Sequence, residues 1–183
     1  MKNKEMDGLD EIEEAEKKLI LLLGLQDKPV GEIFIQKEIF LLSQALVELK
    51  DLFEFKKHYQ GPFSDVIHDS LDDPLYFENS FLKIGEKFSL SDEGKIIFKK
   101  ISEIEKKELL VALKLVRELY EKLNEDELLF IIYSSYPDYM EKSNKYKFLF
   151  DERNKLKLVE SLLKKGLISE EKAEELKWNW KGN

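Results

Sequence analysis

The residues of this chain that could do chemistry are concentrated around one histidine in an acidic stretch. Asp65, His68 and Asp72 follow one another at intervals of three and four residues, so a helix would place all three on one face. Imidazole and carboxylate groups in such a set can bind a divalent cation. No second histidine completes the set, because His58 precedes the turn before this helix. We therefore expect a solvated acidic face, with no metal and no other cofactor.

Motifs of the common enzyme classes do not occur in the sequence. There is no Gly-x-x-x-x-Gly-Lys loop, no Gly-x-Ser-x-Gly turn, no His-Glu-x-x-His and no dinucleotide fingerprint. Carboxylate pairs such as Asp72-Asp73 and Asp92-Glu93 are frequent, and in an acidic chain they are typical of solvated surfaces and helix starts. The sequence therefore predicts a binding protein that is not an enzyme and has no catalytic residues.

The acidic stretch could instead bind a protein partner. Six residues are candidates for that contact: Tyr59, Ser64, Asp65, His68, Asp69 and Asp72. All but Tyr59 are expected to point away from an apolar stripe formed by Phe63, Val66, Ile67 and Leu71. Complementary charge steers association and rejects wrong partners. A partner with a basic surface is therefore expected.

A second interpretation makes the same stretch a DNA reader, because the second helix of a helix-turn-helix enters the major groove. The basic residues that could contact DNA flank that helix: Lys56, Lys57, His58, Lys83 and Lys87. The helix itself has no lysine or arginine, and several aspartates on one face would be repelled by phosphates. A protein partner is therefore the preferred expectation, and a DNA-binding transcription regulator is the alternative.

Turn signals predict the elements that position these residues. Gly61-Pro62 indicates a turn followed by a helix that begins near Pro62 and ends before Pro74. Residues 81–84 and 87–90 flank Gly85-Glu86, which is typical of a tight β-hairpin. Ser91 then predicts the N-cap of another helix. A turn, a helix, a hairpin and a helix start follow one another as in a winged helix-turn-helix.

Apolar spacing predicts helices through the rest of the chain. The expected segments are a frayed stretch over residues 1–8, a first helix from about Leu9 to Leu25, a central apolar helix within 32–53, a helix over Leu109 to Leu123, one over Glu125 to Tyr133 capped by Asn124, and two after Asp151 separated by Gly166 and Ser169. The Leu109 to Leu123 segment is apolar on several faces. It could be a buried spine or the interface of a homodimer. Trp178 and Trp180 are expected to dock onto the body or anchor another chain.

Composition bounds the class of protein. The chain has 183 residues, no cysteine and a net charge of −8, so it is one large domain or two small ones without disulfides. The acidic start and the absence of a long apolar run predict no targeting segment and no membrane span, hence a cytoplasmic protein. Charged residues make up 37%, and arginine occurs only at 117 and 153, a bias seen in thermophiles.

Several segments resemble one family of winged-helix proteins. GPFSDVIHDSL, followed by a hairpin ending FSLSDEGK, is similar to the YGPxS…ysLTeeGk pattern of the YwgA-like and Panacea (SocA-like antitoxin) proteins. The earlier IQKEIFLLSQAL resembles that family's lQKlvfLl helix, and YPDYMEKS resembles its YPxYaxxS segment. The resemblance covers about half of the chain. It implies a winged-helix fold and, for the antitoxin-like branch, a role in holding or delivering another protein; it implies no catalytic residues.

These observations together predict a mainly α protein in two parts. Residues 1–100 are expected to form a winged helix-turn-helix with a small β-hairpin wing. Residues 101–183 are expected to form a helical part that packs on the first or shares its core. The expected function is regulatory binding of a protein partner.

Overall fold

The computed structural model describes residues 2–26 and 28–178, of which residues 2–9 are described by their backbone alone. The chain is mainly helical with a small antiparallel sheet. It divides into two compact units. The first unit contains residues up to 56 and residues 63–118, and the second contains residues 57–62 and residues from 119 onward. The expected division near residue 100 therefore lies some way before the observed one.

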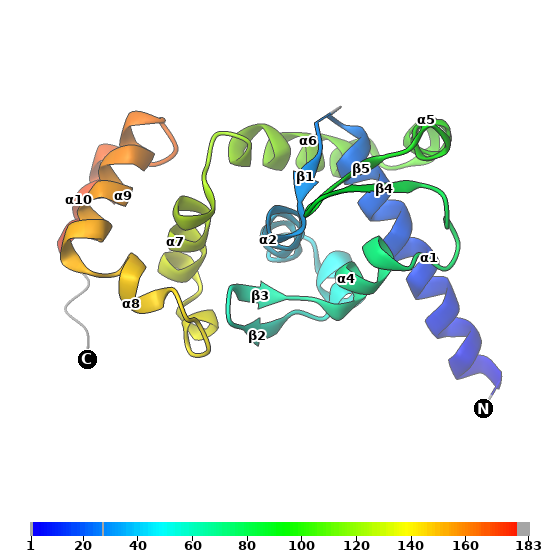
Figure 1. Ribbon diagram of the computed structural model, residues 1–183, viewed down its shortest axis with the longest axis horizontal. Coiled ribbons are helices and arrows are strands. Elements are labelled where there is room, and N and C mark those ends of the chain that lie inside the picture. The colour runs from blue at the N-terminus through cyan, green and yellow to red at the C-terminus, as the bar shows by residue number, and fades with distance from the viewer. Residues whose placement is uncertain (1, 27, 179–183) are drawn as a thin grey trace. The chain divides into compact units, whose positions relative to one another are not determined.

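The elements of the first unit follow one another as α1 (Lys2–Gly24), β1 (Val30–Gly31), α2 (Glu32–Ser43), α3 (Val47–Phe53), α4 (Asp65–Asp72), β4 (Phe81–Ile84), β5 (Lys87–Leu90), α5 (Asp92–Ile104) and α6 (Lys107–Tyr120), whose last two residues are assigned to the second unit. Between α3 and α4, β2 (Lys56–His58) and β3 (Gly61–Phe63) form a separate two-stranded sheet. Helix α1 is central, because it packs against α3, α4, α5 and β5. Figure 1 shows α1 as the long helix beside β4 and β5.

The sheet of the first unit has the strand order β1-β5-β4, with antiparallel pairing throughout. In the register of β4 and β5, Lys83 lies opposite Phe88 and Ile84 lies opposite Lys87. Gly85 has a φ of 64°, which a side chain rarely adopts and a tight hairpin turn requires. The predicted hairpin is therefore confirmed, as is the Ser91 cap, whose hydroxyl accepts the amide of Gly94 at 3.0 Å.

Three local predictions need correction. Residues 2–8, expected to be frayed, belong to α1. The apolar segment 32–53 is two helices, because the chain turns at residues 44–46. The helix expected from near Pro62 begins at Asp65. Pro62 lies in β3 instead, and Ser64 caps the helix by accepting the amide of Ile67 at 3.4 Å.

The second unit contains α7 (Glu125–Ser135), a 3₁₀ helix η1 (Pro137–Met140), α8 (Tyr146–Leu149), α9 (Glu152–Lys164) and α10 (Glu170–Trp178). The predicted Asn124 cap is confirmed: its side chain accepts the amide of Glu127, and Glu127 accepts the amide of Asn124. The buried Glu127 carboxylate also accepts Lys165 Nζ at 2.6 Å, which joins α7 to the end of α9. Trp178 is exposed, and Trp180 lies outside the described residues.

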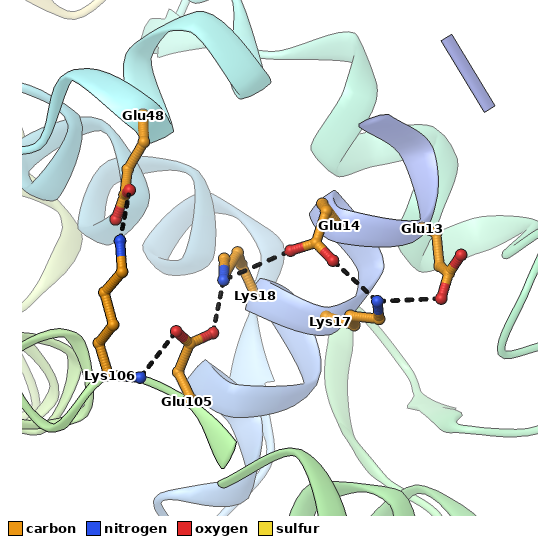
Figure 2. Close-up of polar contacts among 7 residues, drawn as sticks. All are labelled: Glu13, Glu14, Lys17, Lys18, Glu48, Glu105 and Lys106. Atoms are coloured by element: carbon orange, nitrogen blue, oxygen red, sulfur yellow. Dashed lines mark hydrogen bonds and ion pairs between the residues drawn. The ribbon is translucent and has the colours of Figure 1, made fainter. Parts of the chain in front are cut away.

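A network of ion pairs joins α1 to the α5–α6 connection (Figure 2). Lys18 Nζ lies 2.5 Å from a Glu105 oxygen and 3.5 Å from Glu14. Lys106 lies 3.3 Å from Glu48 of α3. The Lys18 and Glu105 side chains are only 12% and 13% exposed, so this pair is screened less by solvent than the outer members. The network fixes the connection between α5 and α6 on the surface of α1.

In the part of the chain that is described, no helix combines the length and the apolar character that crossing a bilayer requires.

Candidate functional site

The candidate site is the outward surface of α4. Ile67 and Leu71 of this helix are buried in the core of the first unit, and α4 packs against α1 and α3. Asp65, Asp69 and Asp72 lie on the opposite side and are exposed, as is Asp73 after the helix. The helix has no lysine or arginine. We call the set Asp65, His68, Asp69, Asp72 and Asp73 the α4 surface.

Two lysines of the first unit partly neutralise this surface. Lys56 forms an ion pair with Asp65, and Lys83 Nζ lies 2.6 Å from Asp72. Both lysines were predicted as candidate DNA contacts. Asp69 and Asp73 have no ion-pair partner among the described residues. The α4 surface therefore has a net negative charge that could bind an external cationic group.

His68 is positioned by a carboxylate from a neighbouring helix. Its Nδ1 lies 2.9 Å from Glu32 of α2, and its Nε2 lies 3.9 Å from Asp72. The hydrogen bond with Glu32, aided by the charges of Asp72 and Asp69, raises the pKa of His68 above its ordinary value. His68 therefore gains positive charge at a higher pH than an isolated histidine, and that charge offsets part of the acidic surface.

The structure separates Ser64 from the predicted contact residues. Ser64 was expected to point outward, and that prediction is wrong, because Ser64 is fully buried. The amide side chain of Gln36 in α2 binds both backbone groups of Ser64, donating to its carbonyl at 2.9 Å and accepting from its N–H at 2.8 Å. Ser64 thus fixes the start of α4 against α2 and is not available to a partner.

Four of the predicted candidates are not counted in the α4 surface. Tyr59, Lys57 and His58 belong to the second unit. There, the Tyr59 carbonyl accepts the amide of Asn144 at 3.1 Å, and Lys57 forms an ion pair with Glu141. Lys87 lies in the first unit, exposed on β5. The α4 surface is therefore defined from first-unit residues alone.

The loop after α4 is held by Glu16, a residue that sequence reasoning missed. The Glu16 carboxylate is fully buried and accepts three consecutive backbone N–H groups, from Leu75 at 2.6 Å, Tyr76 at 3.0 Å and Phe77 at 2.9 Å. The loop presents Leu75 and Tyr76, which are 54% and 40% exposed. In the sequence, Glu16 lies among the apolar helix positions Ala15, Leu19 and Ile20. An acidic residue among such positions is the sequence signal that could have identified a buried carboxylate.

Gln36 was missed as well, although it lies in a segment that carries the family resemblance. A glutamine within an apolar helix must find hydrogen-bond partners if it is buried. Gln36 finds them in Ser64, which lies in another of the segments quoted for that resemblance. Two separate pieces of the sequence pattern therefore meet in one contact of the fold.

The β4–β5 hairpin adds exposed apolar side chains to the first unit. Leu82 and Ile84 of β4 are 48% and 53% exposed. They alternate with Phe81 and Lys83, which share the other side of the strand with buried Phe88 and Leu90. Exposed apolar residues that lie together often mark a binding surface.

A metal site of the kind considered from the sequence does not form among the described residues, where no group of three histidine or acidic side chains could hold an ion. Asp65 is engaged by Lys56, and His68 by Glu32. What the α4 surface can do chemically is bind an external cationic group through carboxylates.

Among known proteins, no family model, no curated sequence and no solved structure matches this chain.

Proposed function

We propose that this chain is a winged-helix protein that acts by binding a protein partner with a basic surface, in an antitoxin-like or adaptor-like role. The order of elements supports the winged-helix part of the proposal. A helix, a short strand and further helices precede a β-hairpin, and the first strand pairs with the last to give the order β1-β5-β4. Helix α4, which directly precedes that hairpin, is then the counterpart of a recognition helix.

One observation carries the choice of partner. The outward side of α4 exposes Asp65, Asp69 and Asp72, and Asp73 is exposed directly after the helix, where a DNA reader would present lysine or arginine. The lysines nearest to them, Lys56 and Lys83, are already paired with two of these aspartates. A basic protein surface complements this arrangement, whereas a phosphate backbone would be repelled by it.

The proposal is tested by photo-crosslinking in extracts of the source cells. A photoreactive phenylalanine analogue is placed at position 69 of the full chain, and at position 51 in a matched control, because Asp51 is an exposed aspartate of the same unit on α3. We expect a protein that crosslinks from position 69 and not from position 51. Asp73→Lys should weaken the crosslink from position 69, because it reverses a charge of the surface without changing the probe.

The DNA-binding alternative is measured on the same protein. Fluorescence anisotropy with random duplex DNA is titrated against salt, since phosphate contacts give a steep loss of affinity with salt. Micromolar binding with a steep salt slope, lost in a variant with alanine at Lys56, Lys57, Lys83 and Lys87, would overturn the proposal in favour of a transcription regulator. Absence of any crosslink specific to position 69 would contradict it independently.

A further inference from the structure

We propose that the partner binds by adding an extended segment to the free edge of β4, and that in this segment apolar and basic residues alternate. The inference rests on the proposed function and specifies how the partner is held. It concerns three features that meet at this strand: an open backbone edge, exposed apolar side chains on one face, and the acidic α4 surface on the other.

The backbone edge of β4 is open. In the described part of the chain, β4 pairs only with β5. The N–H of Ser91 donates to the carbonyl of Ser80 at 2.9 Å, so residues 80 and 91 form a hydrogen-bonded pair just before the β4–β5 ladder. Because such pairs alternate with non-bonded pairs along an antiparallel ladder, the N–H and C=O groups of Phe81 and Lys83 point away from β5. These are the groups to which an added strand would bind.

The edge lacks the protection that isolated edges usually have. A lysine in an edge strand normally discourages pairing by keeping its charge in the path of another strand. Lys83 does not do so, because its ammonium group lies 2.6 Å from Asp72 and 5.1 Å from the centre of the Phe88 ring. The Lys83 side chain is 52% exposed but extends toward α4, and its charge is paired with Asp72 of the same unit.

The two faces of β4 determine the side chains of the added strand. On the outer face, Leu82 and Ile84 are about half exposed, and apolar residues opposite them would bury that surface. On the inner face, the reach of Lys83 to Asp72 shows that the end of α4 lies within one lysine side chain of β4. Basic residues of the added strand would therefore face the aspartates at the end of α4. Alternation of apolar and basic residues follows from the period of a strand.

Charge selects this occupant over two others. A second copy of the chain would bring two acidic α4 surfaces together if it paired through the same edge, and like charges oppose that arrangement. Nucleic acid would bring phosphates to the same aspartates. A segment with lysine or arginine at every second position can pair with the edge of β4 and is attracted to the aspartates.

The test uses a fluorescent capped peptide, Lys-Val-Lys-Val-Lys-Val-Lys, and the full chain. In an antiparallel added strand, the residues opposite Phe81 and Lys83 share their face and exchange hydrogen bonds with them, so the peptide lysines donate to β4. A matched peptide carries backbone N-methyl groups on its two central lysines, which keeps the charges and side chains but removes the N–H groups on that edge. A second control is the peptide with glutamate in place of lysine. We expect the N-methylated peptide to bind at least about tenfold more weakly than the parent, and the glutamate peptide not to bind.

Variants of the chain locate the site. Ile84→Ser should weaken binding severalfold, whereas Ile104→Ser should not, because Ile104 is also exposed, at 86%, but lies on α5. Asp69→Asn combined with Asp73→Asn should weaken binding, whereas Asp51→Asn should not. The amide signals of Phe81 and Lys83 should shift in NMR spectra and exchange more slowly with solvent when the parent peptide is bound.

The outcomes separate this inference from the proposed function. If both valine peptides bind with equal affinity and only the aspartate variants lose them, the α4 surface binds cations but no strand is added, and the inference fails alone. If the parent peptide does not bind, or binds equally well to Ile84→Ser, the inference is also overturned. A failure of the proposed function would be seen instead as the absence of a crosslink from position 69.

Discussion

Gly61 is the residue whose replacement should affect the second unit most directly. Its φ is 85°, and a Cβ there would lie 3.2 Å from a Leu129 methyl carbon and 3.3 Å from a Tyr133 ring carbon. Gly61→Ala should therefore lower the free energy of unfolding by about 2 to 4 kcal/mol, from backbone strain and crowding together. The measurement is urea denaturation, monitored by the tryptophan fluorescence of the second unit.

Gly166→Ala is the matched control for that experiment. Gly166 has a comparable φ of 70° and belongs to the same unit, and a methyl group added there would have nothing within 4 Å. Its replacement should lower the free energy of unfolding by about 1 kcal/mol, because only backbone strain contributes there. Equal losses in the two variants would show that Leu129 and Tyr133 do not constrain Gly61.

Glu16 is expected to order the loop at residues 75–77. In Glu16→Gln one carboxylate oxygen is replaced by an NH₂ group, which would face an N–H donor that it cannot satisfy. A loss of about 2 to 4 kcal/mol is expected, because buried backbone donors would be left without an acceptor. Amide hydrogen exchange should become faster at Leu75, Tyr76 and Phe77 in particular.

Glu13→Gln provides the comparison on the same helix. Glu13 is 37% exposed and pairs with Lys17 at 2.9 Å, so its replacement should cost under about 0.5 kcal/mol. If Glu16→Gln were no more destabilising than Glu13→Gln, the three hydrogen bonds would not be needed to hold the loop.

Glu38 should make stability depend on pH near neutrality. It is fully buried on α2, and burial raises its pKa to about 7, although Arg117 binds it at 2.6 and 2.7 Å and opposes the rise. A carboxyl whose pKa is higher in the folded than in the unfolded chain binds more protons when folded. Its contribution to stability is therefore fully present below its ordinary pKa of 4.5 and is lost as pH rises through about 7.

The measurement compares wild type with Glu38→Gln, which does not titrate. Between about pH 5 and about pH 8, the unfolding free energy of wild type should fall by about 2 to 3 kcal/mol relative to the variant. A difference between the two proteins that stays constant over this range would mean that the Arg117 ion pair keeps Glu38 charged throughout.

At the scale of elements, α6 buries one face and exposes another. Leu109, Leu113 and Arg117 are buried, whereas Val111 and Leu115, four residues apart, are 57% and 53% exposed. Since burying these side chains against a second copy would remove apolar area from water, we expect weak self-association at high protein concentration. Light scattering after size exclusion should detect it in wild type.

The variant for that test is Val111→Glu with Leu115→Glu, and the control is Ile104→Glu, a change at an exposed apolar residue of α5. Only the α6 variant should remain monomeric at the highest concentration. A wild-type mass that stays monomeric throughout would exclude a dimer through α6.

The elements that could be predicted from the sequence are those fixed by local chemistry. Ser91, Asn124 and Gly85 each act within a few residues of themselves, as a cap, a capping box or a turn, so their types and spacing suffice. The start of α4 was misplaced because Gly61-Pro62 is equally compatible with a strand. Contacts of Ser64 with Gln36 and of Gly61 with Leu129, far away in the sequence, decide between the two.

The candidate site was predictable in part for the same reason. The helical period of the α4 sequence was enough to predict that Asp65, Asp69 and Asp72 are exposed. The burial of Ser64, the ion pairs of Lys56 and Lys83, and the role of Glu16 all depend on residues between 9 and 61 positions away. Such pairings are set by tertiary packing, which a periodic pattern does not record.

At the scale of the whole molecule, the chain passes into the second unit at residue 57, returns at residue 63 and leaves again after residue 118. A gene cut after codon 118 would leave Gly61 in one product, and Leu129 and Tyr133, which crowd it, in the other. The product up to residue 118 would contain the whole first unit, whereas the product from residue 119 onward would lack residues 57–62 and would be incomplete. Mapping activity by deletion would therefore report a false loss for the second unit, whereas the two products made together could restore it.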